Sequence, residues 1–100
     1  MRKGLFAVTR TRGPSWDAAR PLEEQEGWAG HAKFMNGLKD EGFILLGGSL
    51  EGTPDVLFII RAESEEEIRS RLAADSWSLN GLLKIKQIAP WTVRLGKIQS

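Results

Sequence analysis

The fold of this chain is decided near its middle, where the sequence reads Phe43-Ile-Leu-Leu-Gly-Gly-Ser-Leu-Glu-Gly-Thr-Pro-Asp-Val-Leu-Phe-Ile-Ile60. The stretch opens with an apolar run over residues 43–46 and closes with a second apolar run over residues 56–60. Between them lie glycines, a proline and short polar residues, which are the residue types that form turns. Two short apolar runs on either side of a turn are typical of a β-hairpin. We therefore expect two antiparallel strands here.

Two further strands are predicted towards the ends of the chain. Residues 5–11 mix apolar and β-branched side chains and end at Gly13-Pro14, as a strand followed by a break does. Residues 82 to about 95 predict a last strand, in which the odd-numbered side chains share one face if the strand is unbroken.

Helices are expected in the two gaps between these strands. The first is predicted from Pro21 to about Glu41, because proline suits the first turn of a helix and Gly42 is a typical stop. The second begins at Ser64, which is followed three residues later by Glu67 in the pattern of a capping box, and it fades near residue 74.

The resulting order, strand–helix–strand–strand–helix–strand, is that of the ferredoxin-like βαββαβ arrangement. We therefore predict an α+β fold in which two helices cover one face of a four-stranded antiparallel sheet. A length of 100 residues suits a single domain that spans residues 1–100.

Composition narrows the classes of function. The chain has no cysteine, which excludes disulfides, thiolate nucleophiles and sulfur ligands for metals. Its 14 basic and 13 acidic residues lack the basic excess of nucleic-acid-binding proteins. The apolar run at residues 5–8 is too short for a signal peptide or a membrane span. We expect a cytoplasmic protein that binds neither nucleic acid nor membrane.

The apolar runs of the hairpin also predict a partner. Antiparallel strands with one wet face should alternate apolar and polar side chains, but residues 43–46 and 56–60 are apolar throughout. The sheet face opposite the helices would then be a contiguous apolar patch, which monomers rarely expose. We predict a homodimer in which two copies pack sheet to sheet.

Two residues could carry acid–base chemistry. His31, which is the only histidine, falls in phase with Phe34, Met35 and Leu38 on the apolar stripe of the first helix. Its position alone favours a core histidine over a functional one. Asp75 follows the second helix, where its position alone favours a structural role as an N-cap or in an Asx turn.

Other polar positions give weaker signals. The backbone at Gly48 and Ser49 could approach a ligand, although a glycine pair in a strand is more often a bulge. Gln87 would lie on the apolar face of the last strand unless a bulge turns it outward. Arg10 and Arg12 could attract an anion. The sequence has no catalytic triad, two-histidine metal site or dinucleotide fingerprint, so we expect neither a metal nor a cofactor.

Four ordered motifs resemble the YCII-related (YciI-like) family. They are His31-Ala-Lys-Phe-Met-Asn-Gly-Leu38, Gly42-Phe-Ile-Leu-Leu-Gly-Gly48, Asp75-Ser-Trp77 and Ile88-Ala-Pro-Trp91. The resemblance implies a dimeric α/β barrel of two ferredoxin-like protomers, similar to muconolactone isomerases. The family includes a dehydrochlorinase that acts on a chlorinated hydroxyhydroquinone, while most members have no assigned reaction.

The resemblance also implies that His31 and Asp75 are the active-site pair. Ser76 stands where the family usually has proline, so the loop that carries Asp75 is expected to be less rigid. Imidazole exchanges protons near neutral pH, and a carboxylate on one ring nitrogen fixes its tautomer.

The leading hypothesis is a small cofactor-independent lyase or isomerase, related to the dehydrochlorinase, with a small aromatic or hydroxylated substrate. His31 and Asp75 would be catalytic, and Phe34, Gly48, Ser49 and Trp77 would contact the substrate. The alternative is a non-catalytic small-molecule-binding module with the same dimeric barrel. A cofactor-free monooxygenase shares the expected fold, so the fold alone does not reject it.

Overall fold

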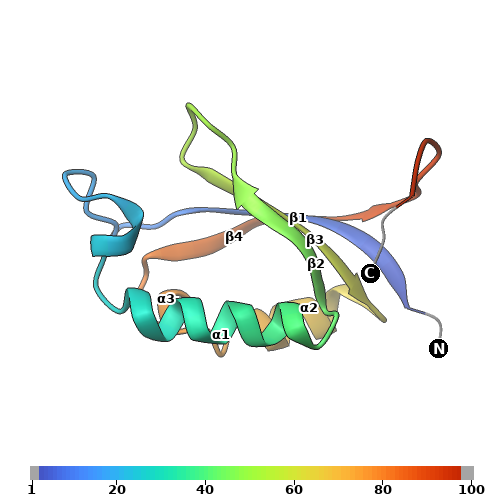
Figure 1. Cartoon of the computed structure of the whole chain (residues 1–100), viewed down its shortest axis with the longest axis horizontal. Helices are drawn as coiled ribbons and strands as arrows, with labels where there is room; N and C mark the ends of the chain where they lie inside the picture. The colour runs from blue at the N-terminus through green and yellow to red at the C-terminus, as the bar shows by residue number, and fades with distance from the viewer. Residues whose placement is uncertain (1–2, 98–100) are drawn as a thin grey trace.

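The computed structural model describes residues 3–97 and contains four strands, three α-helices and one short 3-10 helix (Figure 1). Their bounds, in chain order, are β1 Gly4–Arg12, η1 Leu22–Glu24, α1 Trp28–Asp40, β2 Ile44–Ser49, β3 Asp55–Ala62, α2 Glu65–Leu72, α3 Ser76–Leu79 and β4 Leu83–Trp91.

The strands form one antiparallel sheet in the order β2-β3-β1-β4. The helices lie together on one face of this sheet (Figure 1). This is the predicted ferredoxin-like α+β arrangement, with α3 as an additional short helix between α2 and β4. Among residues 3–97, no helix is long and apolar enough to cross a membrane.

The main core lies between the sheet and the helix layer. It is built from apolar side chains that alternate along the strands and repeat at helical spacing along α1 and α2. Its buried members are Phe6, Val8, Leu38, Phe43, Ile44, Phe58, Ile60, Ala62, Ile68 and Leu72. Fully burying one such large side chain contributes about 1.5–3 kcal/mol, so this layer anchors the elements that carry the site.

The first helix starts later than predicted. Residues near Pro21 form only the one-turn η1, and α1 begins at Trp28. Gly27 has a φ of 77°, a left-handed conformation that interrupts a helix. The buried Gln25 also holds the preceding loop, because its amide accepts from Asp17 N and donates to Asp17 O and Arg20 O. These tertiary bonds favour a loop over a continuous helix.

The sequence signals for the end of the first helix and the start of the second are present in the structure. Gly42, with a φ of 81°, follows α1 as its predicted stop. At the start of α2, Ser64 Oγ accepts from Glu67 N at 3.1 Å. The reciprocal bond of the capping box reaches one residue further back, where Glu67 Oε1 accepts from Glu63 N at 2.8 Å.

The last strand differs from the prediction in length and in register. It ends at Trp91 rather than near residue 95. The pairing with β1 shifts between Gln87, opposite Thr9, and Ile85, opposite Arg10. The extra residue turns Gln87 to the face opposite the helices, where it is exposed. Of the two alternatives for Gln87, the outward bulge is the one observed. Because of this bulge, the odd-numbered side chains of β4 do not share one face.

Candidate functional site

The structure brings His31 and Asp75 into contact although 44 residues separate them in the chain. His31 lies in the first turns of α1, and Asp75 is the N-cap residue of α3. Nδ1 of His31 lies 2.8 Å from Oδ2 and 2.9 Å from Oδ1 of Asp75. Asp75 is fully buried, and His31 retains only 7% of its surface exposed.

Arg10 is a third member of this buried group. Phe6, Val8 and Arg10 alternate along β1, so all three point to the helix side of the sheet. Nη1 of Arg10 lies 2.9 Å from Oδ2 of Asp75, and Nη2 donates to Oγ of Ser78 at 2.6 Å. The anion that Arg10 attracts is therefore an aspartate of its own chain.

Several donors hold the carboxylate of Asp75. Burial raises the pKa of Asp75, but hydrogen bonds from His31 and Arg10, together with their charges, outweigh it and hold the pKa below its usual value. Trp77 N also donates to Oδ1 at 3.2 Å, so Asp75 is an N-cap as well as a partner of His31. Burial likewise lowers the pKa of Arg10, against the hydrogen bond and charge of Asp75. The carboxyl group of Asp75 therefore remains ionised at neutral pH.

This environment fixes where the neutral imidazole carries its proton. An ionised carboxylate only accepts hydrogen bonds, so Nδ1 of His31 must be the protonated nitrogen. Nε2 then carries the free lone pair, and it has no hydrogen-bond partner within residues 3–97. A histidine held in this tautomer can accept a proton at Nε2.

The imidazole ring is also fixed by stacking. The His31 and Trp77 rings lie parallel within 7°, with centroids 3.8 Å apart. The indole is itself anchored, because Trp77 Nε1 donates to Glu26 O at 2.7 Å. Such an aromatic pair contributes about 0.5–1.5 kcal/mol beyond the area it buries. His31 is therefore held both at its Nδ1 edge and on one ring face.

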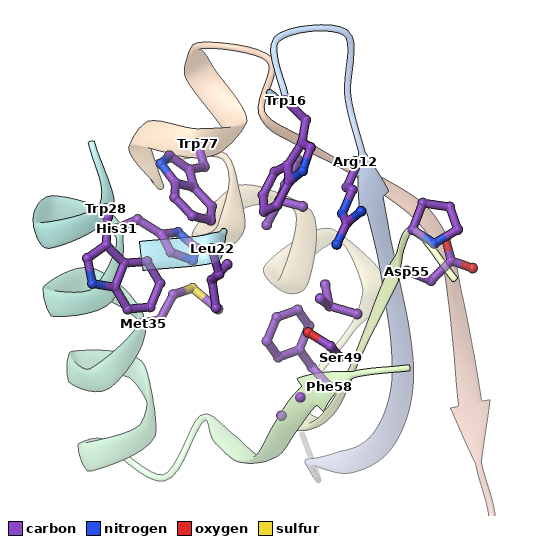
Figure 2. Close-up of a pocket in the computed structure, with 15 residues that line it drawn as sticks. Arg12, Trp16, Leu22, Trp28, His31, Met35, Ser49, Asp55, Phe58 and Trp77 are labelled. Atoms are coloured by element: carbon purple, nitrogen blue, oxygen red, sulfur yellow. The ribbon is translucent and has the colours of Figure 1, made fainter. Parts of the chain in front are cut away.

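A cavity of about 270 Å³ lies beside this group (Figure 2). Its walls come from all four strands, from α1, η1 and the loop after β1, from the turn between β2 and β3, and from Trp77 of α3. They are mainly apolar and aromatic. The lining residues are Arg12, Trp16, Leu22, Trp28, His31, Met35, Gly47, Gly48, Ser49, Pro54, Asp55, Val56, Phe58, Trp77 and Leu83.

Of the four residues predicted to contact the substrate, three line the cavity and one does not. Gly48, Ser49 and Trp77 line the cavity together with His31. Phe34 instead packs against the main core, and Met35, one position further along α1, lines the cavity. Asp75 lies behind His31 and does not line the cavity.

Sequence reasoning missed several parts of this site. The burial of Arg10 could have been found, because it continues the inward alternation of β1. Trp16 and Leu22 come from the irregular segment before α1, whose path no local pattern predicts. Ser76, which stands in place of the family's proline, is the first residue of α3, and Asp75 caps this helix. Within residues 3–97, no group of three or more histidine or acidic side chains is arranged to hold a metal ion.

No family model matches the chain, and no curated protein matches its sequence. Among solved structures, it is similar to the 5-chloro-2-hydroxyhydroquinone dehydrochlorinase from Burkholderia phenoliruptrix AC1100, determined in complex with 2,5-dihydroxybenzoquinone. The TM-score is 0.60 at 23% sequence identity, over 92% of this chain and 95% of that one. This likeness supports the ferredoxin-like α+β fold described above. At 23% identity, the likeness between the two chains is one of fold.

Proposed function

We propose that this protein is a small cofactor-independent enzyme of the YCII-related type, in which His31 is the general acid or base and Asp75 orients it. The observation that carries the proposal is the contact between Nδ1 of His31 and the buried carboxylate of Asp75, at the wall of an aromatic cavity. Perturbed ionisable groups that meet beside a cavity favour a functional site over a purely structural pair.

The chemistry follows from the free lone pair of His31. Nε2 accepts a proton from a substrate C–H or O–H, while the substrate's electron pair expels a leaving group or moves to form a double bond. In a dehydrochlorination, the proton goes to Nε2 and the chlorine departs as chloride, so the substrate loses the elements of HCl. The positive charge formed on the imidazole lies against the Trp77 ring face and the Asp75 carboxylate.

The size of the cavity favours a small ring as the substrate. Binding pockets for organic ligands typically measure about 300–1,000 Å³, and a cavity of about 270 Å³ lies just below this range. It suits one substituted aromatic or quinonoid ring better than a nucleotide or a lipid. Phe58, Met35 and Trp28 supply apolar surface for the faces and edges of such a ring.

We also propose a cytoplasmic homodimer, packed through the sheet face that the helices leave open. Leu46 pairs with Ile59, which pairs with Ala7, and these side chains point away from the core residues Phe6 and Val8. Leu46 is 60% exposed in the single chain. A second copy placed on this face would withdraw it from water.

The direct test uses His31→Ala and His31→Asn with 5-chloro-2-hydroxyhydroquinone, the substrate named for the structural neighbour, as the first probe. The asparagine variant keeps an N–H that can reach Asp75, but it lacks a second nitrogen that could accept a proton in place of Nε2. We expect wild-type protein to release chloride and both variants to lose that release while unfolding cooperatively. Chloride release by either variant at the wild-type rate would contradict the proposed role.

A related enzyme and a binding module would give different results in the same assay. A hydroxyquinone that binds and is recovered unchanged, with an affinity insensitive to pH across the histidine range, favours the non-catalytic module. Oxygen uptake with the same substrate favours a cofactor-free monooxygenase. The proposed enzyme, the binding module and the monooxygenase could all have this fold, so the products of the assay decide between them.

A further inference from the structure

Arg12 is a cation at the cavity wall without an acidic partner. It is the last residue of β1, and its backbone N–H donates to Pro54 O at 3.0 Å. The guanidinium lies over the indole of Trp16, with Cζ 4.6 Å from the ring centroid. It makes no ion pair or side-chain hydrogen bond with any residue that the structure describes. Its N–H donors are therefore free to meet a ligand.

Two tryptophans in contact with each other lie behind Arg12. Trp16 packs edge-on against Trp77, with ring centroids 5.6 Å apart, and Trp77 is fully buried. A guanidinium stacked on an indole keeps its N–H groups in its own plane, at right angles to the stacking direction. Figure 2 shows the Arg12 side chain reaching into the cavity from the β1 side, whereas Trp28, His31 and Met35 enter from α1.

The remaining charges of the cavity do not neutralise Arg12. Its lining contains three ionisable residues, Arg12, His31 and Asp55. Lys86 Nζ lies 2.8 Å from Oδ2 of Asp55, while Oδ1 is buried and forms no ion pair with Arg12 or any other cation among residues 3–97. His31 is paired with Asp75 and offers Arg12 no negative charge. An uncharged ligand would therefore cover Arg12 without providing a counter-ion.

We infer that Arg12 determines specificity by selecting planar ligands with an anionic oxygen at the end remote from His31. This inference rests on the proposed small-ring substrate and adds its charge and orientation. The planar fork of arginine suits a carboxylate or an enolate that shares its negative charge between two oxygens. Ser49, whose hydroxyl makes no hydrogen bond within residues 3–97, lines the same cavity as a second donor. The ring of the ligand would then lie between Arg12 and Nε2 of His31.

The test is calorimetric binding of matched charged and uncharged rings to the full chain at pH 8. One arm compares benzoate with benzamide, and the other compares 2,5-dihydroxybenzoquinone with its uncharged dimethyl ether. The two arms distinguish a carboxylate from an enolate as the anionic group. The variants are Arg12→Gln, which removes the charge, and Arg69→Gln, a matched control on the exposed surface of α2.

Wild-type protein should bind the anion of at least one pair roughly tenfold or more tightly than its neutral partner, as a charge-assisted hydrogen bond predicts. Arg12→Gln should abolish this preference and leave the affinity for the neutral ring within about twofold, while Arg69→Gln changes neither. An unchanged preference in Arg12→Gln, or no binding of either anion at millimolar concentration, would overturn the inference. Turnover that depends on His31 without this anion preference would refute only the role of Arg12.

Discussion

Arg10 and Asp75 form an ion pair at 2.9 Å in which neither side chain is exposed to solvent, although 65 residues separate them. The pair connects the centre of the sheet to the start of α3, where Asp75 also meets His31. One carboxylate therefore fixes the position of a strand, a short helix and an imidazole. Because the Asp75 carboxylate holds these three parts of the molecule together, a charged pair is present inside a layer that is otherwise mainly apolar.

Removing Arg10 should destabilise the fold more than removing both charges. Arg10→Met keeps a long apolar stem but leaves the buried Asp75 carboxylate without its cationic partner, which costs about 3–5 kcal/mol in comparable pairs. Urea unfolding should show this loss in the free energy of unfolding. The double variant Arg10→Met/Asp75→Asn should recover part of it, because no unpaired charge remains.

The control for this cycle is Arg69→Met, whose partner Glu65 lies on the exposed surface of α2. An exposed pair of this spacing contributes about 0.3–0.5 kcal/mol. If Arg10→Met cost no more than Arg69→Met, the buried pair would not have the structural role assigned to it.

The element order could be predicted from the sequence because its signals are local. The apolar runs of the hairpin and the Ser64–Glu67 cap each depend on residues a few positions apart. The start of α1 could not be predicted in this way. It depends on the bonds of Gln25 to the loop at Asp17, which exist only in the folded chain.

The site was predictable only in part, for a similar reason. His31 and Asp75 stood out through a family resemblance, whereas helical periodicity alone favoured a core histidine. The register shift in β4 is a property of its pairing with β1, so the orientation of Gln87 needed the structure. The partner of Arg10 and the place of Trp16 in the cavity depend on contacts that no local pattern encodes.

Acid should remove the stability that Asp75 contributes. Its pKa is lower in the folded chain than the value of about 3.9 expected in the unfolded chain. Its contribution is therefore complete at pH values above the unfolded pKa and is lost as the pH falls through the folded pKa. The difference in unfolding free energy between wild type and Asp75→Asn should be largest near neutral pH and should shrink below about pH 4.

Urea titrations at a series of pH values would measure this difference. Asp55→Asn is the matched control, because hydrogen bonding to Lys86 also lowers the pKa of Asp55, but the Lys86 side chain is 57% exposed and solvent screens the pair from that side. Its pH-dependent effect should be the smaller one. A wild-type-to-Asp75→Asn difference that stays constant from neutral to acid pH would exclude the proposed contribution of Asp75.

The proposed homodimer predicts that two exposed leucines respond differently to charge. Leu46 is 60% exposed on the open sheet face, and Leu79 is 77% exposed on α3 in the helix layer. Leu46→Glu would place a carboxylate in the sheet-to-sheet interface and should convert the protein to monomers. Leu79→Glu should leave the dimer intact. Sedimentation equilibrium at micromolar concentration reads out both results, and a monomeric wild type would reject the dimer itself.

The two neighbouring glycines of β2 should tolerate a methyl group unequally. A Cβ on Gly47 would lie 2.7 Å from Cδ1 and 3.0 Å from Cε1 of Phe58, so the ring would have to move. A Cβ on Gly48 would meet no atom within 4 Å. Neither glycine has a positive φ, so the backbone itself accepts alanine at both positions.

Gly47→Ala should therefore lower the free energy of unfolding by about 1–3 kcal/mol, the usual cost of overpacking. Because Phe58 lines the cavity, the variant should also weaken the binding of a ring-shaped ligand. Gly48→Ala should be neutral, or more stable by up to about 1 kcal/mol through the lower entropy of the unfolded chain. Urea unfolding and calorimetric binding of benzoate measure the two effects. Equal stability and equal affinity in both variants would show that the close approach of Gly47 to Phe58 does not shape the cavity.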